Sequence, residues 1–103
     1  MIKLTVLYGH PTETDAFERY YATTHMPLVG KIQGVRRTEK AKVVGTPDGS
    51  QPAYHRIFEF WFDDQPQMQQ VLGSAEAQAP VADLGNFATG GVTILISQVE
   101  DGA

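Results

Sequence analysis

Residues 54–62, with the sequence YHRIFEFWF, restrict the fold more than any other stretch of this chain. They have the period-two pattern of a β-strand. Bulky side chains point both ways, with Tyr54, Arg56, Phe58, Phe60 and Phe62 on one face and His55, Ile57, Glu59 and Trp61 on the other. We therefore expect that neither face of the sheet is fully solvated around this strand.

Three further stretches have the pattern of strands. Residues 2–8 alternate as a strand with one strongly buried face, and residues 92–99 are apolar on both faces. Residues 35–44 carry lysines on one face, which is typical of an exposed edge strand.

Two helical regions separate these strands. Residues 13–24 form an amphipathic pattern that Thr12 and Asp15 would cap, and Pro27 should end this helix near His25. The second region begins with a helix capped by Asp63 or Asp64, which runs to about Leu72 and is ended by Gly73. Residues 74–87 form a weaker helical stretch, which Pro80 should interrupt.

The resulting order, β-α-β-β-α-β, predicts one α+β domain over residues 1–103. Its compact form is a ferredoxin-like βαββαβ sandwich, in which an antiparallel sheet carries both helices on one face. The other face would meet water in a monomer, although two strands present apolar side chains there. We therefore predict a homodimer whose two sheets pack face to face around a two-fold axis.

Composition excludes several functions. The 103 residues carry a formal charge of −4 with no basic run longer than two, which disfavours nucleic acid as a partner. No cysteine is present, so neither a disulfide framework nor thiolate metal chemistry is available. The first residues lack the features of a signal peptide or a membrane span, so a soluble cytoplasmic protein is the default expectation.

His25 is the candidate catalytic residue. It follows Tyr21 by four residues and Phe17 by eight, so all three share the buried side if the helix reaches this far. A buried imidazole can exchange protons near neutral pH and act as a general acid or base. The structural alternative is that His25 only hydrogen-bonds the end of its helix.

Other candidate site residues are aromatic or acidic. Glu59 lies inside the most apolar strand and is either an acid of raised pKa or the partner of a cation such as Arg36 or Arg37. Nothing argues for a metal site, since no metal-ligand spacing occurs, and phosphate-loop and nucleophile-elbow motifs are absent. A substrate pocket would be lined by Tyr8, Tyr21, Phe60 and Trp61, together with Glu59.

These features resemble the EthD family of the dimeric α+β barrel superfamily over almost the whole chain. The resemblance rests on Tyr8, Pro11, Phe17, the pair Tyr20-Tyr21, the step His25-Met26-Pro27-Leu28 and Gly34. It implies a ferredoxin-like fold, a dimer joined through its sheets, and a pocket between each sheet and its own helices. The family is named for a small protein associated with ethyl tert-butyl ether degradation beside a cytochrome P450 system. The superfamily also includes cofactor-free monooxygenases, isomerases, cyclases and haem enzymes, so the fold does not fix the function.

Three functions compete. The first is a cofactor-independent enzyme of catabolism or secondary metabolism that moves a proton on a small apolar molecule, with His25 as acid or base. The second is a non-catalytic binding or accessory protein for a hydrophobic metabolite or a partner oxygenase. The third is a haem protein, which would need His25 or His55 as an iron ligand.

Overall fold

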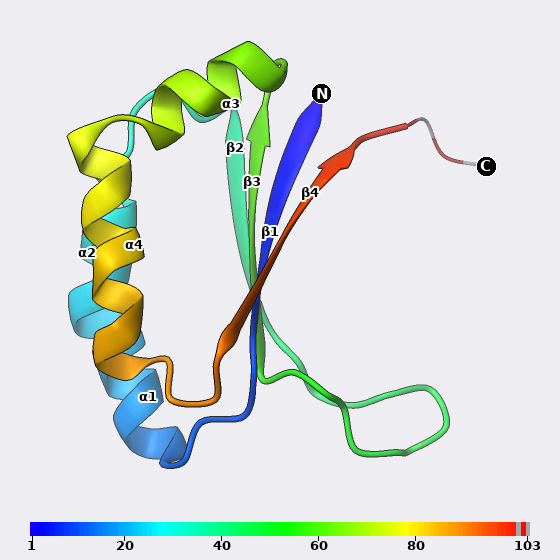
Figure 1. Cartoon of the computed structure of the whole chain (residues 1–103). Helices are drawn as coiled ribbons and strands as arrows, with labels where there is room; N and C mark the ends of the chain where they lie inside the picture. Colours follow the sequence, from blue (N-terminus) through cyan, green and yellow to red (C-terminus); the bar gives the residue numbers. More distant parts are fainter. Residues whose placement is uncertain (101, 103) are drawn as a thin grey trace.

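The computed structural model describes residues 1–100 and 102. One four-stranded sheet carries all the helices on a single face (Figure 1). The elements in chain order are β1 (Ile2–Tyr8), α1 (Thr14–Tyr20), a π-helical turn (Tyr21–His25), α2 (Met26–Val29), β2 (Arg37–Lys42), β3 (Arg56–Phe62), α3 (Gln65–Leu72), α4 (Ala75–Phe87) and β4 (Val92–Gln98).

The sheet has the strand order β2-β3-β1-β4, and every neighbouring pair is antiparallel. The predicted ferredoxin-like architecture is confirmed, with β2 as an exposed edge strand. In the central register, Leu4 of β1 lies between Phe60 of β3 and Ile96 of β4. These three side chains share the face that the helices cover, and their sequence neighbours point to the open face.

The hydrophobic core lies between the helices and this face of the sheet. Burying each large side chain there contributes about 1.5–3 kcal/mol to folding. The π turn and the helices around it supply residues spaced by four, so that Phe17, Tyr21, His25 and Val29 are all buried. The remaining buried hydrophobic side chains are Leu4, Val6, Tyr8, Phe58, Phe62, Met68, Val71, Ala77 and Phe87.

The first helical region differs from the sequence prediction at both ends. Helix α1 has Glu13 rather than Thr12 at its N-cap and no side-chain cap, and the Thr12 hydroxyl instead donates to the Thr89 hydroxyl, at 3.3 Å. The chain also does not leave the helix before Pro27. It passes through a π turn, in which the Met26 N–H bonds the Tyr21 carbonyl five residues back, and α2 then begins. Pro27 therefore lies inside a continuous helical stretch, as the second residue of α2.

The second helical region consists of two helices, as predicted, but the second of them is not interrupted. The Asp64 carboxylate caps α3 by accepting from the Gln67 N–H, and Gly73 ends that helix, as predicted. Ser74 caps α4, which then continues through Pro80 to Phe87. The expected break does not occur, since burial of the Pro80 ring offsets the lost helical hydrogen bond. No helix in the described residues is long and apolar enough to cross a membrane.

Candidate functional site

A cavity of about 310 Å³ lies between the helices and the sheet. Its wall is apolar except near Tyr8 and His25, which lie close together at one end. Three wall residues, Val81 of α4 and Ile94 and Ile96 of β4, are about half exposed, so the cavity opens between α4 and β4. This volume and polarity are those of a site for a small organic molecule.

His25 is the ionisable group of this cavity wall. The π turn places it on the buried side of its helix, where only 2% of the residue is exposed. Its Nδ1 lies 2.9 Å from Oδ2 of Asp83 in α4, and its Nε2 lies 3.5 Å from the Tyr8 hydroxyl. Single π turns inside α-helices frequently occur at functional sites.

Asp83 fixes which nitrogen of His25 carries the proton. Burial raises the pKa of Asp83, but hydrogen bonds from Tyr20, Asn86 and His25 outweigh it and hold this pKa below its usual value. The Tyr20 hydroxyl donates to Oδ1 at 2.6 Å, and the Asn86 side-chain amide donates to the same oxygen at 2.9 Å. An ionised carboxylate only accepts hydrogen bonds, so Nδ1 of His25 carries a hydrogen. In the neutral ring, Nε2 is then a free base that faces Tyr8.

Tyr8 supplies a neutral hydroxyl beside Nε2. Burial is the largest cause that raises the pKa of Tyr8 well above its ordinary value, and repulsion from Tyr21 raises it further. The hydroxyl therefore keeps its proton at neutral pH. The 3.5 Å contact with His25 is at the outer limit of a hydrogen bond. A substrate atom could replace it with little loss.

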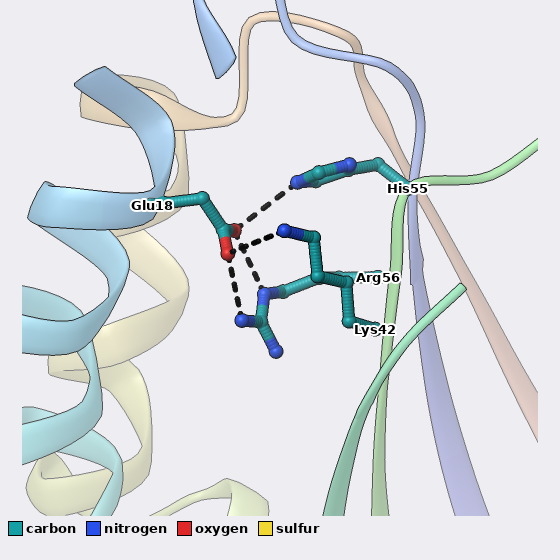
Figure 2. Close-up of polar contacts among 4 residues, drawn as sticks. All are labelled: Glu18, Lys42, His55 and Arg56. Atoms are coloured by element: carbon teal, nitrogen blue, oxygen red, sulfur yellow. Dashed lines mark hydrogen bonds and ion pairs between the residues drawn. The ribbon is translucent and has the colours of Figure 1, made fainter. Parts of the chain in front are cut away.

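A second histidine, His55, makes a different carboxylate contact, with Glu18 of α1. Figure 2 shows Glu18 of α1 surrounded by Lys42, His55 and Arg56. Arg56 donates two hydrogen bonds of 2.8 Å to this carboxylate, and His55 Nε2 lies 3.1 Å from it. The hydrogen bond from Arg56 is the largest cause that lowers the pKa of Glu18 to about 2. This cluster joins α1 to the sheet.

The structure brings together only part of the predicted site. Tyr8, His25 and Phe60 line the cavity, whereas Tyr21 packs behind it and stacks on Phe17. Glu59 and Trp61 do not line the cavity, because they point to the open face of the sheet.

Glu59 is paired, but not with the arginines that the sequence indicated. Lys3 lies 3.0 Å from its carboxylate, and the Thr5 hydroxyl donates to it at 3.2 Å. Arg37 instead pairs with Glu39, at 2.8 Å, and lies over the ring of Trp61. Lys3 and Thr5 point to the same open face of the sheet as Glu59, and β1 is the strand next to β3, so they are its neighbours across the strands.

Asp83 and Tyr20 are site residues that the sequence analysis missed. Asp83 follows Pro80 by three residues and precedes Phe87 by four, so an uninterrupted helix places it on the apolar stripe. A carboxylate on such a stripe indicates a buried polar contact, because charged residues are rarely buried without a partner. In the described part of the chain, no three His, Cys, Asp or Glu side chains are placed to hold a metal ion.

Comparisons with known proteins agree with this architecture. The family model of the EthD domain matches residues 9–91. An 11.0 kDa protein from the thcB-thcC intergenic region of Rhodococcus erythropolis is 35% identical to this chain. The match covers 97% of this chain and 96% of that protein. The chain belongs to the EthD family.

Solved structures show the same fold. The crystal structure of an EthD family protein from Bacillus halodurans has a TM-score of 0.90 and 33% identity, and the match covers 97% of this chain and 99% of that one. A dimeric ferredoxin-like protein of unknown function from Thermobifida fusca has a TM-score of 0.71 and 13% identity, over 95% of this chain and 90% of that one. EthD membership and the cavity support a domain that binds a small molecule or acts on it.

Proposed function

We propose that this EthD protein is an enzyme that moves a proton on a small apolar molecule, with His25 as the general base. One observation carries the proposal: a buried imidazole has Nδ1 held by the Asp83 carboxylate and Nε2 turned toward Tyr8 in an apolar cavity. A base in such a position typically contributes about 10²–10⁴-fold to a rate. The chemistry needs no cofactor.

The residues suit enolisation of a carbonyl compound. Nε2 of His25 would take a proton from the carbon beside the carbonyl, and the electron pair would move onto the carbonyl oxygen. Asp83 would stabilise the imidazolium that forms, while the Tyr8 hydroxyl would donate to the developing oxyanion. His25 would then return the proton to the same or another carbon, which completes an isomerisation without a net change of protons.

Deuterium exchange tests this proposal without knowledge of the natural substrate. We would incubate the protein with 2-tetralone in D₂O and follow the loss of the proton signal at the acidic carbon by NMR. The wild type should accelerate the exchange, and His25→Gln should remove the acceleration. His10→Gln is the matched control, because His10 is exposed and bonds the Pro52 carbonyl far from Asp83. Exchange at the wild-type rate in His25→Gln would contradict the proposal.

The alternative is a binding or accessory protein for a hydrophobic metabolite or a partner oxygenase. The apolar cavity supports it equally well, since only His25 and Tyr8 offer protons there. On this alternative, His25→Gln would change affinity and no exchange would occur. On the third hypothesis, a haem protein, the Tyr8 hydroxyl would have to move from its place 3.5 Å from Nε2 before His25 could bind iron.

We also propose that two copies pack through the open face of the sheet. Leu7, Ile57 and Trp61 lie on this face, and Leu95 of β4 is 53% exposed there. Sedimentation velocity tests the proposal with Leu95→Glu, which should dissociate a dimer. Val81→Glu is the control, because Val81 is 58% exposed on α4, which covers the opposite face of the sheet (Figure 1). A monomeric wild type at micromolar concentration would rule the dimer out.

A further inference from the structure

A polar vestibule of about 540 Å³ lies beside the cavity, between α2 and β2. The two spaces share five apolar wall residues from α2, the segment after it, and β3: Met26, Val29, Ile32, Phe58 and Phe60. These side chains form the boundary between the two spaces, so a molecule that occupies both would pass between them. The vestibule also differs from the cavity in charge, because Arg36 and Lys40 line it, while the side chains of Arg37 and Glu39 point to the open face of the sheet.

Positive charge is concentrated beside the vestibule against the overall balance of the chain. Five of the eight basic residues of this net acidic protein occur between residues 31 and 42, where Glu39 is the single acid. Such a local excess attracts anions even on a protein of net negative charge. The five are Lys31, Arg36, Arg37, Lys40 and Lys42.

Lys40 differs from the other four basic residues in the combination of its ion pairs and the face of the sheet to which it points. Arg36 pairs with Asp63, Arg37 with Glu39, and Lys42 lies 3.7 Å from Glu18. No ion pair within residues 1–100 and 102 involves Lys40. Lys40 pairs across the sheet with Phe58, so it points to the helix side, as does Thr38 two residues earlier. Its charge is therefore available to a ligand.

We infer that the ligand of this cavity is an organic acid whose carboxylate binds at Lys40 and Thr38 while its apolar body lies in the cavity. Lys40 pairs with Phe58 of β3, Phe58 pairs with Val6 of β1, and Tyr8 is two residues after Val6. The spacing of strands and residues in a sheet then places the Cα atoms of Lys40 and Tyr8 about 12 Å apart. The Asp83 charge at the His25 end repels a carboxylate, so the acid group points toward β2 and the opposite end of the molecule, with the uncharged carbonyl that would be enolised, lies at His25. This inference deepens the proposed function by naming the class of substrate.

Binding of a matched acid and amide tests the inference without turnover. The probes are 2-naphthylacetate and 2-naphthylacetamide, which differ in charge and little in shape. Affinities would be measured by calorimetry, and NMR shifts of the Val29 and Ile94 methyl groups would report whether the naphthalene enters the cavity. We expect the wild type to bind the acid about fivefold more tightly, as for an exposed ion pair, with a smaller preference at high salt.

Two variants complete the test. Lys40→Gln should remove the preference for the acid, whereas Lys31→Gln should keep it, because Lys31 is exposed and does not line the vestibule. Equal wild-type affinities, a preference that survives in Lys40→Gln, or probes that leave the cavity methyl signals unchanged would each overturn the inference. Proton transfer by His25 is judged separately, by the deuterium exchange of His25→Gln.

Discussion

The two buried histidines of this protein each contact a carboxylate, yet their surroundings differ. Glu18 receives His55 together with Arg56 and Lys42, so its charge is neutralised by fixed cations on the sheet. Asp83 receives His25 and two neutral donors, and the second nitrogen of His25 faces a cavity. On the proposed function, the partners of the carboxylate and the space beyond the imidazole, rather than the His–carboxylate contact itself, separate a structural pair from a reactive one.

Asp83→Asn should have the largest effect on proton transfer. An amide at this position can donate to Nδ1, which would reverse the tautomer and leave a hydrogen on Nε2. We expect the exchange rate of 2-tetralone to fall by about 10²–10⁴-fold. The far-ultraviolet circular dichroism should remain that of the wild type, because the substitution preserves shape. Undiminished exchange in a folded variant would show that Asp83 does not orient His25.

Glu18→Gln should have the largest effect on stability. It leaves Arg56 and His55 without their carboxylate, which should cost about 2–3 kcal/mol in the free energy of unfolding measured with urea. Binding of 2-naphthylacetate to the folded variant should be unchanged, because Glu18 does not line the cavity. A stable variant with impaired binding would reverse the roles assigned to the two clusters.

The Glu18 cluster also predicts how stability depends on pH. The pKa of Glu18 is lowered from 4.5 to about 2 on folding, so the unfolded chain binds this proton first. The stabilisation is complete above about pH 4.5 and is lost as the pH falls toward 2. The difference in unfolding free energy between the wild type and Glu18→Gln should therefore shrink over that interval. A constant difference would show that the Glu18 charge does not stabilise the fold.

Tyr8→Phe should have a smaller effect on proton transfer than Asp83→Asn. It removes the donor beside the developing oxyanion but leaves His25 and Asp83 in place, so exchange should fall by about 10–10²-fold. The urea midpoint should change little, because the ring remains packed among Phe17, Tyr21 and Phe87. An unchanged exchange rate would remove Tyr8 from the proposed mechanism.

Tyr21→Phe should have the smallest effect. The Tyr21 hydroxyl is buried without a hydrogen-bond partner in the described residues, and burial raises its pKa to about 12. Removing an unsatisfied hydroxyl should be neutral or stabilise the protein by up to about 1 kcal/mol. Exchange of 2-tetralone should not change, because Tyr21 does not line the cavity. Loss of exchange would place this hydroxyl in the site.

The fold could be predicted from sequence because its signals are local. Alternation marked the strands, Asp64 and Gly73 marked the ends of a helix, and the element order left one compact arrangement. Two predictions based on proline were wrong. A π turn carries the chain through Pro27, and tertiary packing carries α4 through Pro80. Local preferences do not include such packing.

The site could be predicted only in part, because it depends on contacts between distant segments. The spacing of His25, Tyr21 and Phe17 indicated their common buried side, and burial confirms it. Phe60 and Trp61 are adjacent in β3, so they point to opposite faces and only one can reach the cavity. Because we expected the helix to break at Pro80, the side of the helix on which Asp83 lies could not be predicted. Asp83 is also 58 residues away in sequence from its partner His25.

The tautomer of His25 decides whether the cavity contains a free base. Long-range ¹H–¹⁵N NMR of the imidazole distinguishes a protonated nitrogen from a basic one. We expect that the neutral ring of His25 carries its hydrogen on Nδ1 in the wild type and that Nε2 is the basic nitrogen. A neutral ring with its hydrogen on Nε2 would contradict it, because His25 would then have no free base toward the cavity.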